Sequence, residues 1–333
     1  MTRVISFTKN GNNLNHILCE KMQFNGFSVL EDERLTKCRL KEWVAEGFEK
    51  KQCMVFVGAA GIAVRSIAPY IKDKLTDPAV IVIDEKGEFV IPILGGHVGG
   101  GNAIGKEISQ AISAKAVITT ATDVNNVFAV DVFAVRNNLI IKEREIAKKI
   151  SAELLNGRKI GYYSDIEIKG NIPQNLAKME NADLGFNISI VKKNCFKETL
   201  HLVPKQVVLG IGCKKGTAEK DIEQAVFKAF EEYNIDILAV AEVATIDIKK
   251  NEKGLIDFCK KMNLKLRCFS AEELKKAEGC FTSSDFVKKT TGVDNVCERA
   301  AVFVCGGELI IKKTKGEGVT VAAALRSWSV DFE

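Results

Sequence analysis

The sequence lacks the features of several protein classes. Its 333 residues contain only three histidines, which lie far apart, and no HExxH pattern, so nothing in it indicates a zinc or other metal site of its own. No apolar run is long enough to span a bilayer, and the first residues, MTRVISFTKNG, show neither the charged nor the apolar region of a signal peptide. We therefore expect a cytoplasmic protein that spans no membrane.

Cysteine pairing motifs and basic clusters are also missing. Ten cysteines are present, but none forms a CxxC pair, so we expect reduced thiols, most of them small buried apolar residues. The net charge of +5 is small, and basic residues gather only in pairs such as Lys214-Lys215 and Lys312-Lys313, which are typical of solvated faces. This balance weakly favours an acidic small molecule as partner and argues against DNA, which favours a concentrated basic stripe.

The chain does contain a regular alternation of short apolar runs and amphipathic segments. That alternation indicates an α/β fold with helices packed on both faces of parallel sheets, and the length indicates more than one core. We predict N-terminal and C-terminal parallel-sheet α/β domains joined by a smaller α+β middle segment. The predicted boundaries are 1–126, 127–204 and 205–333. Residues 127–135, VFAVDVFAV, alternate as a strand does.

Glycine-rich turns follow several of the predicted strands, in VGAAGIAVR (57–65), LGGHVGGGN (94–102), TTATDVNN (119–126) and LGIGCKKGT (209–217). Ligands of open α/β sheets bind beyond the carboxyl ends of the strands, and backbone amides at helix N-termini suit anions. We expect an anionic ligand to be bound there by Gly58, Gly61, Arg65, Gly95, Gly96, Gly99, Gly100, Gly101, Asn102, Thr119, Thr120, Gly210, Gly212, Gly216 and Thr217.

The second of these turns is the richest in glycine. Five glycines lie within the seven residues from Gly95 to Gly101, and His97 stands among them. We interpret the loop as a cradle of amides for an anion or oxyanion, with His97 as a proton carrier. The alternative is a tight strand-to-helix turn in which His97 only bonds a backbone carbonyl, but five glycines are more than a turn requires.

Three further side chains have two interpretations each. Arg65 is either a carboxylate clamp or a surface arginine, and Asp123 either acts as a base or orienting group or caps an Asx turn. Glu298 is either an acid whose pKa is raised by apolar neighbours or a surface glutamate. Cys213 lies near a predicted helix N-terminus, which favours thiolate, although no histidine is close in sequence. Thr217 is placed to N-cap that helix.

The turn GIGCKKG invites comparison with dinucleotide-binding loops. Its spacing is G-x-G-x-x-x-G rather than G-x-G-x-x-G, and no acidic residue ends a second strand about twenty residues later. The alternative function of a nucleotide-dependent oxidoreductase is therefore supported by this turn alone.

Four motifs carry a resemblance to a known family. They are GAAGIAVRSIAPYIKDKLTDPAVIVIDEKGEFVIPILGGHVGGGN, ITTATDVNNVFAVDVFA, VVLGIGCKKGT and TGVDNVCERAAVF, in this order and across essentially the whole chain. Together they resemble the cobalt-precorrin-5A hydrolase family of the anaerobic cobalamin pathway. The match is weakest in residues 1–45 and in the middle segment, and Asn126 stands where the family more often has glycine.

The resemblance implies a hydrolase acting on a carbon–carbon bond. Such an enzyme opens the δ-lactone of a cobalt-bound contracted tetrapyrrole with water and releases acetaldehyde. Our hypothesis is that His97, Asp123 or Glu298 activates the water. Amides around the 95–101 loop would then hold the oxyanion.

The resemblance also implies the partners. Cobalt enters with the substrate, so we expect no cofactor and no metal site in the protein. The expected partner is a cobalt corrinoid, with neighbouring pathway enzymes and a second copy of the chain as further candidates. A non-catalytic carrier of tetrapyrrole intermediates is the alternative function.

Overall fold

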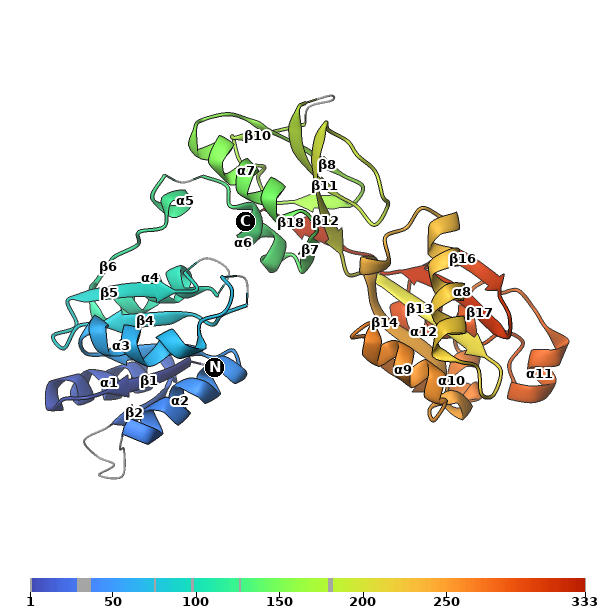
Figure 1. Cartoon of the computed structure of the whole chain (residues 1–333), viewed down its shortest axis with the longest axis horizontal. Helices are drawn as coiled ribbons and strands as arrows, with labels where there is room; N and C mark the ends of the chain where they lie inside the picture. Colours follow the sequence, from blue (N-terminus) through green and yellow to red (C-terminus); the bar gives the residue numbers. More distant parts are fainter. Residues whose placement is uncertain are drawn as a thin grey trace. The chain divides into compact units, whose positions relative to one another are not determined.

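The computed structural model describes residues 2–28, 37–74, 76–96, 99–125, 127–178 and 182–332. The chain forms two compact units, Met1–Val132 and Phe133–Glu333 (Figure 1). Both are α/β, as the sequence predicts, and parallel strand pairs dominate their sheets.

The first unit contains one six-stranded sheet in the order β2-β1-β3-β4-β5-β6. Strands β1 to β4 are parallel, whereas β5 runs antiparallel to β4, and β6 is parallel to β5. The loop after β5 therefore leaves the sheet at the edge opposite to the loops after β1, β3 and β4. The strands are β1 (Thr2–Ser6), β2 (Asn25–Ser28), β3 (Cys53–Val57), β4 (Val80–Ile83), β5 (Phe89–Leu94) and β6 (Lys115–Ala116).

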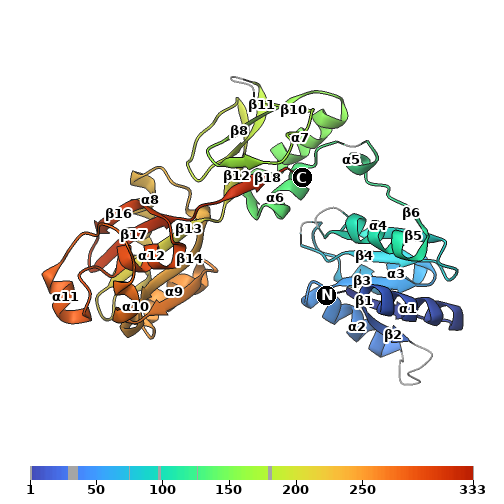
Figure 2. The ribbon, with the colours of Figure 1, turned by 180° about the vertical axis from the view of Figure 1, so that it is seen from behind.

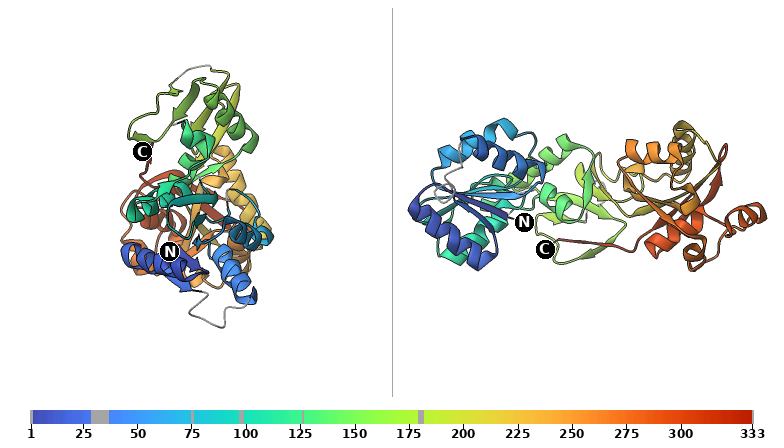
Figure 3. Two further views of the ribbon diagram at one scale, coloured as in Figure 1. Left: turned by 90° about the vertical axis from the view of Figure 1, so that its left-hand side faces the viewer. Right: turned by 90° about the horizontal axis from the view of Figure 1, so that it is seen from below.

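Helices cover both faces of this sheet (Figure 3). On one face α1 and α4 bury Leu18 and Ile108 against the strands, and on the other α2 and α3 bury Val44 and Ala63. Burial of such apolar side chains is the main term that stabilises the unit. The helices are α1 (Lys9–Met22), α2 (Lys37–Glu49), α3 (Ala60–Ile67), the 3₁₀ turn η1 (Ala68–Tyr70), α4 (Gly101–Ile112) and α5 (Ala121–Val124).

The alternating stretch 127–135 is not a strand. It contributes to the helix α6 (Val130–Arg136), which buries Val130, Phe133 and Ala134. These residues have the i, i+3, i+4 spacing of a helix face, and the valines and phenylalanine at other positions only imitate a period of two. The predicted strand was therefore wrong.

The second unit begins with a five-stranded sheet in the order β10-β8-β11-β12-β7. Its strands are parallel except for β7, and α7 (Arg144–Leu155) packs against it. The strands are β7 (Leu139–Ile141), β8 (Ile160–Ser164), β10 (Leu176–Ala177), β11 (Leu184–Ile188) and β12 (Glu198–Pro204).

The last strand of the chain returns to this part of the unit (Figure 2). Strand β18 (Ser329–Asp331) pairs in parallel with β9 (Glu167–Lys169), and Phe332 stacks on Phe133 with ring centroids 4.6 Å apart. The final residues of the predicted segment 205–333 thus pack with the middle segment.

A second five-stranded sheet follows in the order β15-β14-β13-β17-β16. Here β13, β14 and β15 are parallel, and β17 and β16 form an antiparallel hairpin beside β13. The strands are β13 (Val207–Cys213), β14 (Val240–Ile246), β15 (Lys265–Phe269), β16 (Glu308–Lys315) and β17 (Val319–Leu325).

Helices pack on both faces of this sheet as well. One face carries α8 and α9 through Phe230 and Phe258, and the other carries α10 and α12 through Leu274 and Ala300. The helices are α8 (Glu219–Glu232), η2 (Ile237–Ala239), η3 (Asp247–Lys249), α9 (Lys253–Lys261), α10 (Ala271–Lys275), α11 (Asp285–Thr291) and α12 (Cys297–Cys305).

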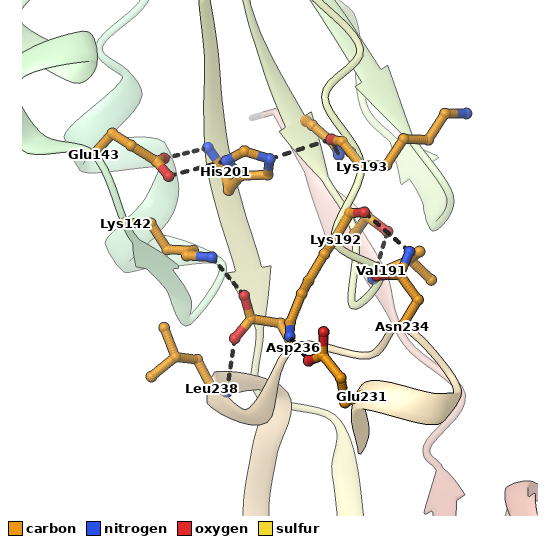
Figure 4. Close-up of polar contacts among 12 residues, drawn as sticks. Lys142, Glu143, Val191, Lys192, Lys193, His201, Glu231, Asn234, Asp236 and Leu238 are labelled. Carbon is orange, nitrogen blue, oxygen red and sulfur yellow. Dashed lines mark hydrogen bonds and ion pairs between the residues drawn. The ribbon is translucent and has the colours of Figure 1, made fainter. Parts of the chain in front are cut away.

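Polar contacts join the two sheets of this unit (Figure 4). Lys142, which follows β7, contacts Asp236 at 2.7 Å, and the other oxygen of that carboxylate accepts from the amide of Leu238 at 3.0 Å.

Within the first sheet of this unit, His201 is held by Glu143, which accepts from its amide at 2.8 Å and lies 3.0 Å from its ring Nδ1. These contacts fix the position of the His201 side chain within the fold.

Candidate functional site

The glycine loop between β5 and α4 packs on the backbone that leads into β4. Gly95 has φ +60°, and a Cβ there would lie 2.7 Å from the carbonyl oxygen of Pro78. A Cβ at Gly99 would lie 2.7 Å from the carbonyl oxygen of Gly95. Glycine is therefore required at these positions by the fold of the loop itself. His97, the predicted proton carrier, lies outside the described residues.

Two amides of the predicted anion cradle are used within the loop. The amide of Gly101 donates to the carbonyl oxygen of Gly95 at 3.0 Å, and the amide of Asn102 donates to that of Gly96 at 2.8 Å. They cannot also hold an oxyanion, so the cradle as predicted loses these two donors. At Gly100, where φ is +76°, a Cβ would meet nothing within 4 Å. This is the position where the loop backbone borders open space.

Asn102 connects the glycine loop to the segment after β6. Its side chain is buried, and Nδ2 donates to Oγ1 of Thr120 at 3.1 Å and to Oδ2 of Asp123 at 2.7 Å. Because β5 and β6 are parallel, both segments leave the sheet at the same edge. The structure thus brings together three of the predicted residues, and exposed Thr119 lies beside them. The contact with Asn102 gives the carboxylate of Asp123 a fixed partner.

The predicted residues of the first turn lie elsewhere. Gly58 follows β3, and its amide donates to the carbonyl oxygen of Ile83 at the end of β4. That edge is opposite to the one carrying Asn102, because β5 is antiparallel to β4. Gly61 lies under the guanidinium of Arg65, whose exposed side chain borders a pocket of about 350 Å³ on α3. The first and second glycine turns both follow the carboxyl end of a strand, but they leave the sheet at opposite edges.

Glu298 is a buried residue in the first turn of α12, with 1% of its surface exposed. Its carboxylate accepts from the amide and hydroxyl of Thr282 at 2.6 and 3.0 Å, from Nδ2 of Asn295 at 2.7 Å and from the amide of Lys313 at 2.7 Å. The alternative of a surface glutamate is excluded. Three of these bonds hold the loop of Thr282 and β16 against α12.

Local packing and hydrogen bonding also explain the glycines at the end of β13 and in the turn after it. A Cβ at Gly210 would clash with the carbonyl oxygen of Cys297, so α12 approaches β13 too closely for any side chain. A Cβ at Gly212 would lie 2.6 Å from Oγ1 of Thr320. Gly216 has φ +79°, and its amide donates to Oε1 of Glu252 at 2.6 Å.

The helix cap predicted at this turn is displaced by one residue. Ala218 is the N-cap of α8, and the hydroxyl of Thr217 donates instead to the carbonyl oxygen of Lys214 at 2.9 Å. The threonine closes the turn rather than the helix.

A pocket of about 530 Å³ opens where β13 and β14 end. These two strands are parallel, and the hairpin of β16 and β17 and the helix α11 complete its wall. Five lysines line it, together with apolar side chains: Lys214, Lys215, Lys249, Lys313 and Lys315, with Ile246, Ile248, Phe286, Val287, Val296 and Val319. We refer to it below as the lysine pocket.

The signal for this pocket in the sequence is weak. The pairs Lys214-Lys215 and Lys312-Lys313 predict solvated faces, because pairs of lysines are common on surfaces. Only the pairing of β17 with β13 brings residues more than a hundred positions apart to one cavity. Their position after strand ends was the available clue.

The cysteine in this turn does not favour the thiolate form. Burial raises the pKa of the Cys213 thiol, while Lys249 opposes this effect. The expectation of a thiolate was therefore wrong.

Within the described ranges, no three His, Cys, Asp or Glu side chains gather as metal ligands would. No helix in the part of the chain that the structure describes is long and apolar enough to cross a membrane.

Known proteins match the chain along most of its length. Family models described as Cobalamin synthesis G N-terminal, Cobalamin biosynthesis central region and Cobalamin synthesis G C-terminus match residues 42–123, 128–192 and 207–324. A cobalt-precorrin-5A hydrolase of Salmonella typhimurium is 35% identical over 317 residues, covering 91% of this chain and 88% of the relative. One of Priestia megaterium is 32% identical over 298 residues, covering 84% and 79%.

Proposed function

The chain belongs to the cobalt-precorrin-5A hydrolase family, and from this we propose that its hydrolytic centre lies where β5 and β6 end. It is a hydrolase of cobalamin biosynthesis that opens the δ-lactone of cobalt-precorrin-5A with water and releases acetaldehyde. The relatives' names do not favour a carrier without activity.

One observation supports this location above the others. Asn102 fixes Asp123 and Thr120 against the glycine loop with bonds of 2.7 and 3.1 Å. A carboxylate oriented by a buried amide is a suitable general base for water. Glu298 is less suited, because protein donors occupy its carboxylate on all sides.

The steps of lactone opening can be assigned to Asp123 and Thr120. The carboxylate of Asp123 takes a proton from water while the water oxygen bonds to the lactone carbonyl carbon. The hydroxyl of Thr120 accepts from Asn102, so its own hydrogen can be donated to the developing oxyanion. The acyl carbon–oxygen bond then breaks, and the leaving oxygen takes a proton to become an alcohol.

Loss of the two-carbon piece completes the reaction. The alcohol gives up its proton, the carbon–carbon bond to the ring breaks, and acetaldehyde leaves while the electron pair and one proton return to the ring. This step needs a second proton carrier. His97 remains the residue that the sequence proposes for it.

We propose that no cofactor is needed, because cobalt arrives inside the substrate. A cytoplasmic location is supported by the cysteines that the structure describes, which are free. Neighbouring pathway enzymes and a second copy of the chain remain proposed partners.

Asp123→Asn tests the proposed base. The variant keeps the size of the side chain but cannot accept a proton at neutral pH, so we expect the turnover rate to fall by about 10²–10⁴-fold. Acetaldehyde is measured by its reduction with NADH and an alcohol dehydrogenase. Glu107→Gln, at an exposed position on α4, is the control and should keep the wild-type rate. Wild-type turnover by Asp123→Asn would remove Asp123 from the mechanism, and a wild-type protein that releases no acetaldehyde would favour a carrier.

A further inference from the structure

We propose that the lysine pocket is a binding site for the carboxylate side chains and apolar ring edge of a cobalt corrinoid. The proposal rests on the proposed function for the identity of the ligand. The pocket belongs to the second unit, so its residues are distinct from the Asn102 and Asp123 cluster.

The positive charges of the pocket are mostly unpaired. Lys249 contacts Glu252 at 3.2 Å. Among the described residues, Lys214, Lys215, Lys313 and Lys315 form no ion pair. Like charges around one cavity repel one another, and an anionic ligand relieves that repulsion. Because the ammonium groups are separate, they can pair with several carboxylates spread around one rigid ring. A single compact anion could not reach all of them.

Part of the pocket lining is apolar. Phe286 is 76% exposed and Ile248 58% exposed, and both border the cavity beside Val296 and Val319. Exposed large apolar side chains grouped at one cavity mark a binding surface. A flat macrocycle fringed by carboxylates offers the matching pattern, an apolar body with charged ends.

The turn after β13, which contributes to the pocket, is unsuited to binding the phosphates of a nucleotide. Its Gly216 amide already donates to the carboxylate of Glu252 at 2.6 Å, and this bond lowers the pKa of Glu252. A carboxylate thus occupies the amide that a phosphate would need. The cavity volume of about 530 Å³ lies within the range of small-ligand sites, and it takes one edge of a corrinoid.

Binding of two cobalt corrinoids tests the proposal. Cobyrinic acid carries free carboxylates on its side chains, whereas cobinamide carries amides on the same ring. We expect the full-length protein to bind cobyrinic acid at least tenfold more tightly than cobinamide, measured by calorimetry, and added salt to weaken that binding. Equal affinity for the two corrinoids would overturn the role of the lysines.

Variants locate the binding. The double variant Lys313→Gln and Lys315→Gln should bind cobyrinic acid at least tenfold more weakly. Lys312→Gln should bind as the wild type does, because Lys312 is an exposed neighbour on β16 that does not line the pocket. If the double variant fails to fold by circular dichroism, Lys215→Gln in the turn after β13 replaces it and should also weaken binding. Unchanged affinity in the folded pocket variants, or equal loss in Lys312→Gln, would overturn the proposal.

Failure of this inference differs from failure of the proposed function. If the wild type releases acetaldehyde and folded pocket variants bind cobyrinic acid unchanged, the pocket assignment is wrong and the hydrolase stands. If the wild type releases none while the pocket variants lose binding, the pocket stands and the hydrolytic centre is wrong.

Discussion

Gly95 and Gly100 both have positive φ angles, yet a methyl group would meet very different surroundings at the two positions. At Gly95 it would lie 2.7 Å from a backbone oxygen, and at Gly100 it would meet nothing within 4 Å. The glycines of this loop therefore serve two purposes. Some let the loop pack on itself and on the backbone that leads into β4, and Gly100 supplies a left-handed turn before α4.

Alanine substitutions separate these purposes. Both variants meet the cost of alanine at positive φ, but Gly95→Ala also forces the backbone of Pro78 to move. We expect Gly95→Ala to lower the free energy of unfolding by about 1–3 kcal/mol more than Gly100→Ala does. Urea unfolding followed by circular dichroism measures the difference. Equal losses would mean that the close approach at Gly95 is not a constraint.

The sequence predicted this site only in part. That Asn102, Thr120 and Asp123 follow strand ends could be inferred from apolar runs and turns, and the structure brings them together. The internal use of two loop amides could not be inferred, because hydrogen bonds across a turn leave no sequence pattern. The placement of His97 stays a prediction.

At the scale of the element, strand direction decides which residues share a site. The repeat of buried strands and helices was predicted from periodicity, because each buried face leaves a pattern. The reversal at β5 separates Gly58 and Gly61 from Asn102, although all follow a strand. The five residues 84–88 join β4 and β5 into a hairpin, but the effect of this reversal on the sites depends on sheet order, which local sequence does not encode.

The four hydrogen bonds to Glu298 join α12 to two other segments. Glu298→Ala would remove the acceptor of the partly buried amides of Thr282 and Lys313, so we expect a loss of about 1–3 kcal/mol in the free energy of unfolding. Glu278→Ala, at an exposed position of the same loop, is the control and should stay within about 0.5 kcal/mol of the wild type. If the two variants unfold alike in urea, Glu298 does not hold these segments.

At the scale of the whole molecule, buried thiols link stability to pH. Burial raises the pKa of Cys53 and Cys259 from 9.0 to about 12 and that of Cys297 to about 11. The unfolded chain releases these protons near pH 9 while the folded chain keeps them, so stability is full below pH 9 and falls as the pH rises towards 11–12. Each thiol should contribute a loss of about 1.4 kcal/mol per pH unit within this range.

The contribution of one thiol can be isolated. We expect Cys259→Ala to lose less stability than the wild type between pH 9 and pH 10, whatever its stability at neutral pH. Cys280→Ser changes an exposed thiol and should keep the wild-type dependence. Parallel pH curves for all three proteins, from thermal unfolding, would contradict the burial of Cys259.

The proposed mechanism requires that water attacks the carbonyl carbon of the lactone on this enzyme. Single turnover of cobalt-precorrin-5A in heavy-oxygen water, followed by mass spectrometry of the ring product, tests it directly. We predict one heavy oxygen in the newly formed carboxylate, and none in product incubated in that water afterwards. A ring product without heavy oxygen would show that the bond on the other side of the lactone oxygen breaks, and would contradict the mechanism.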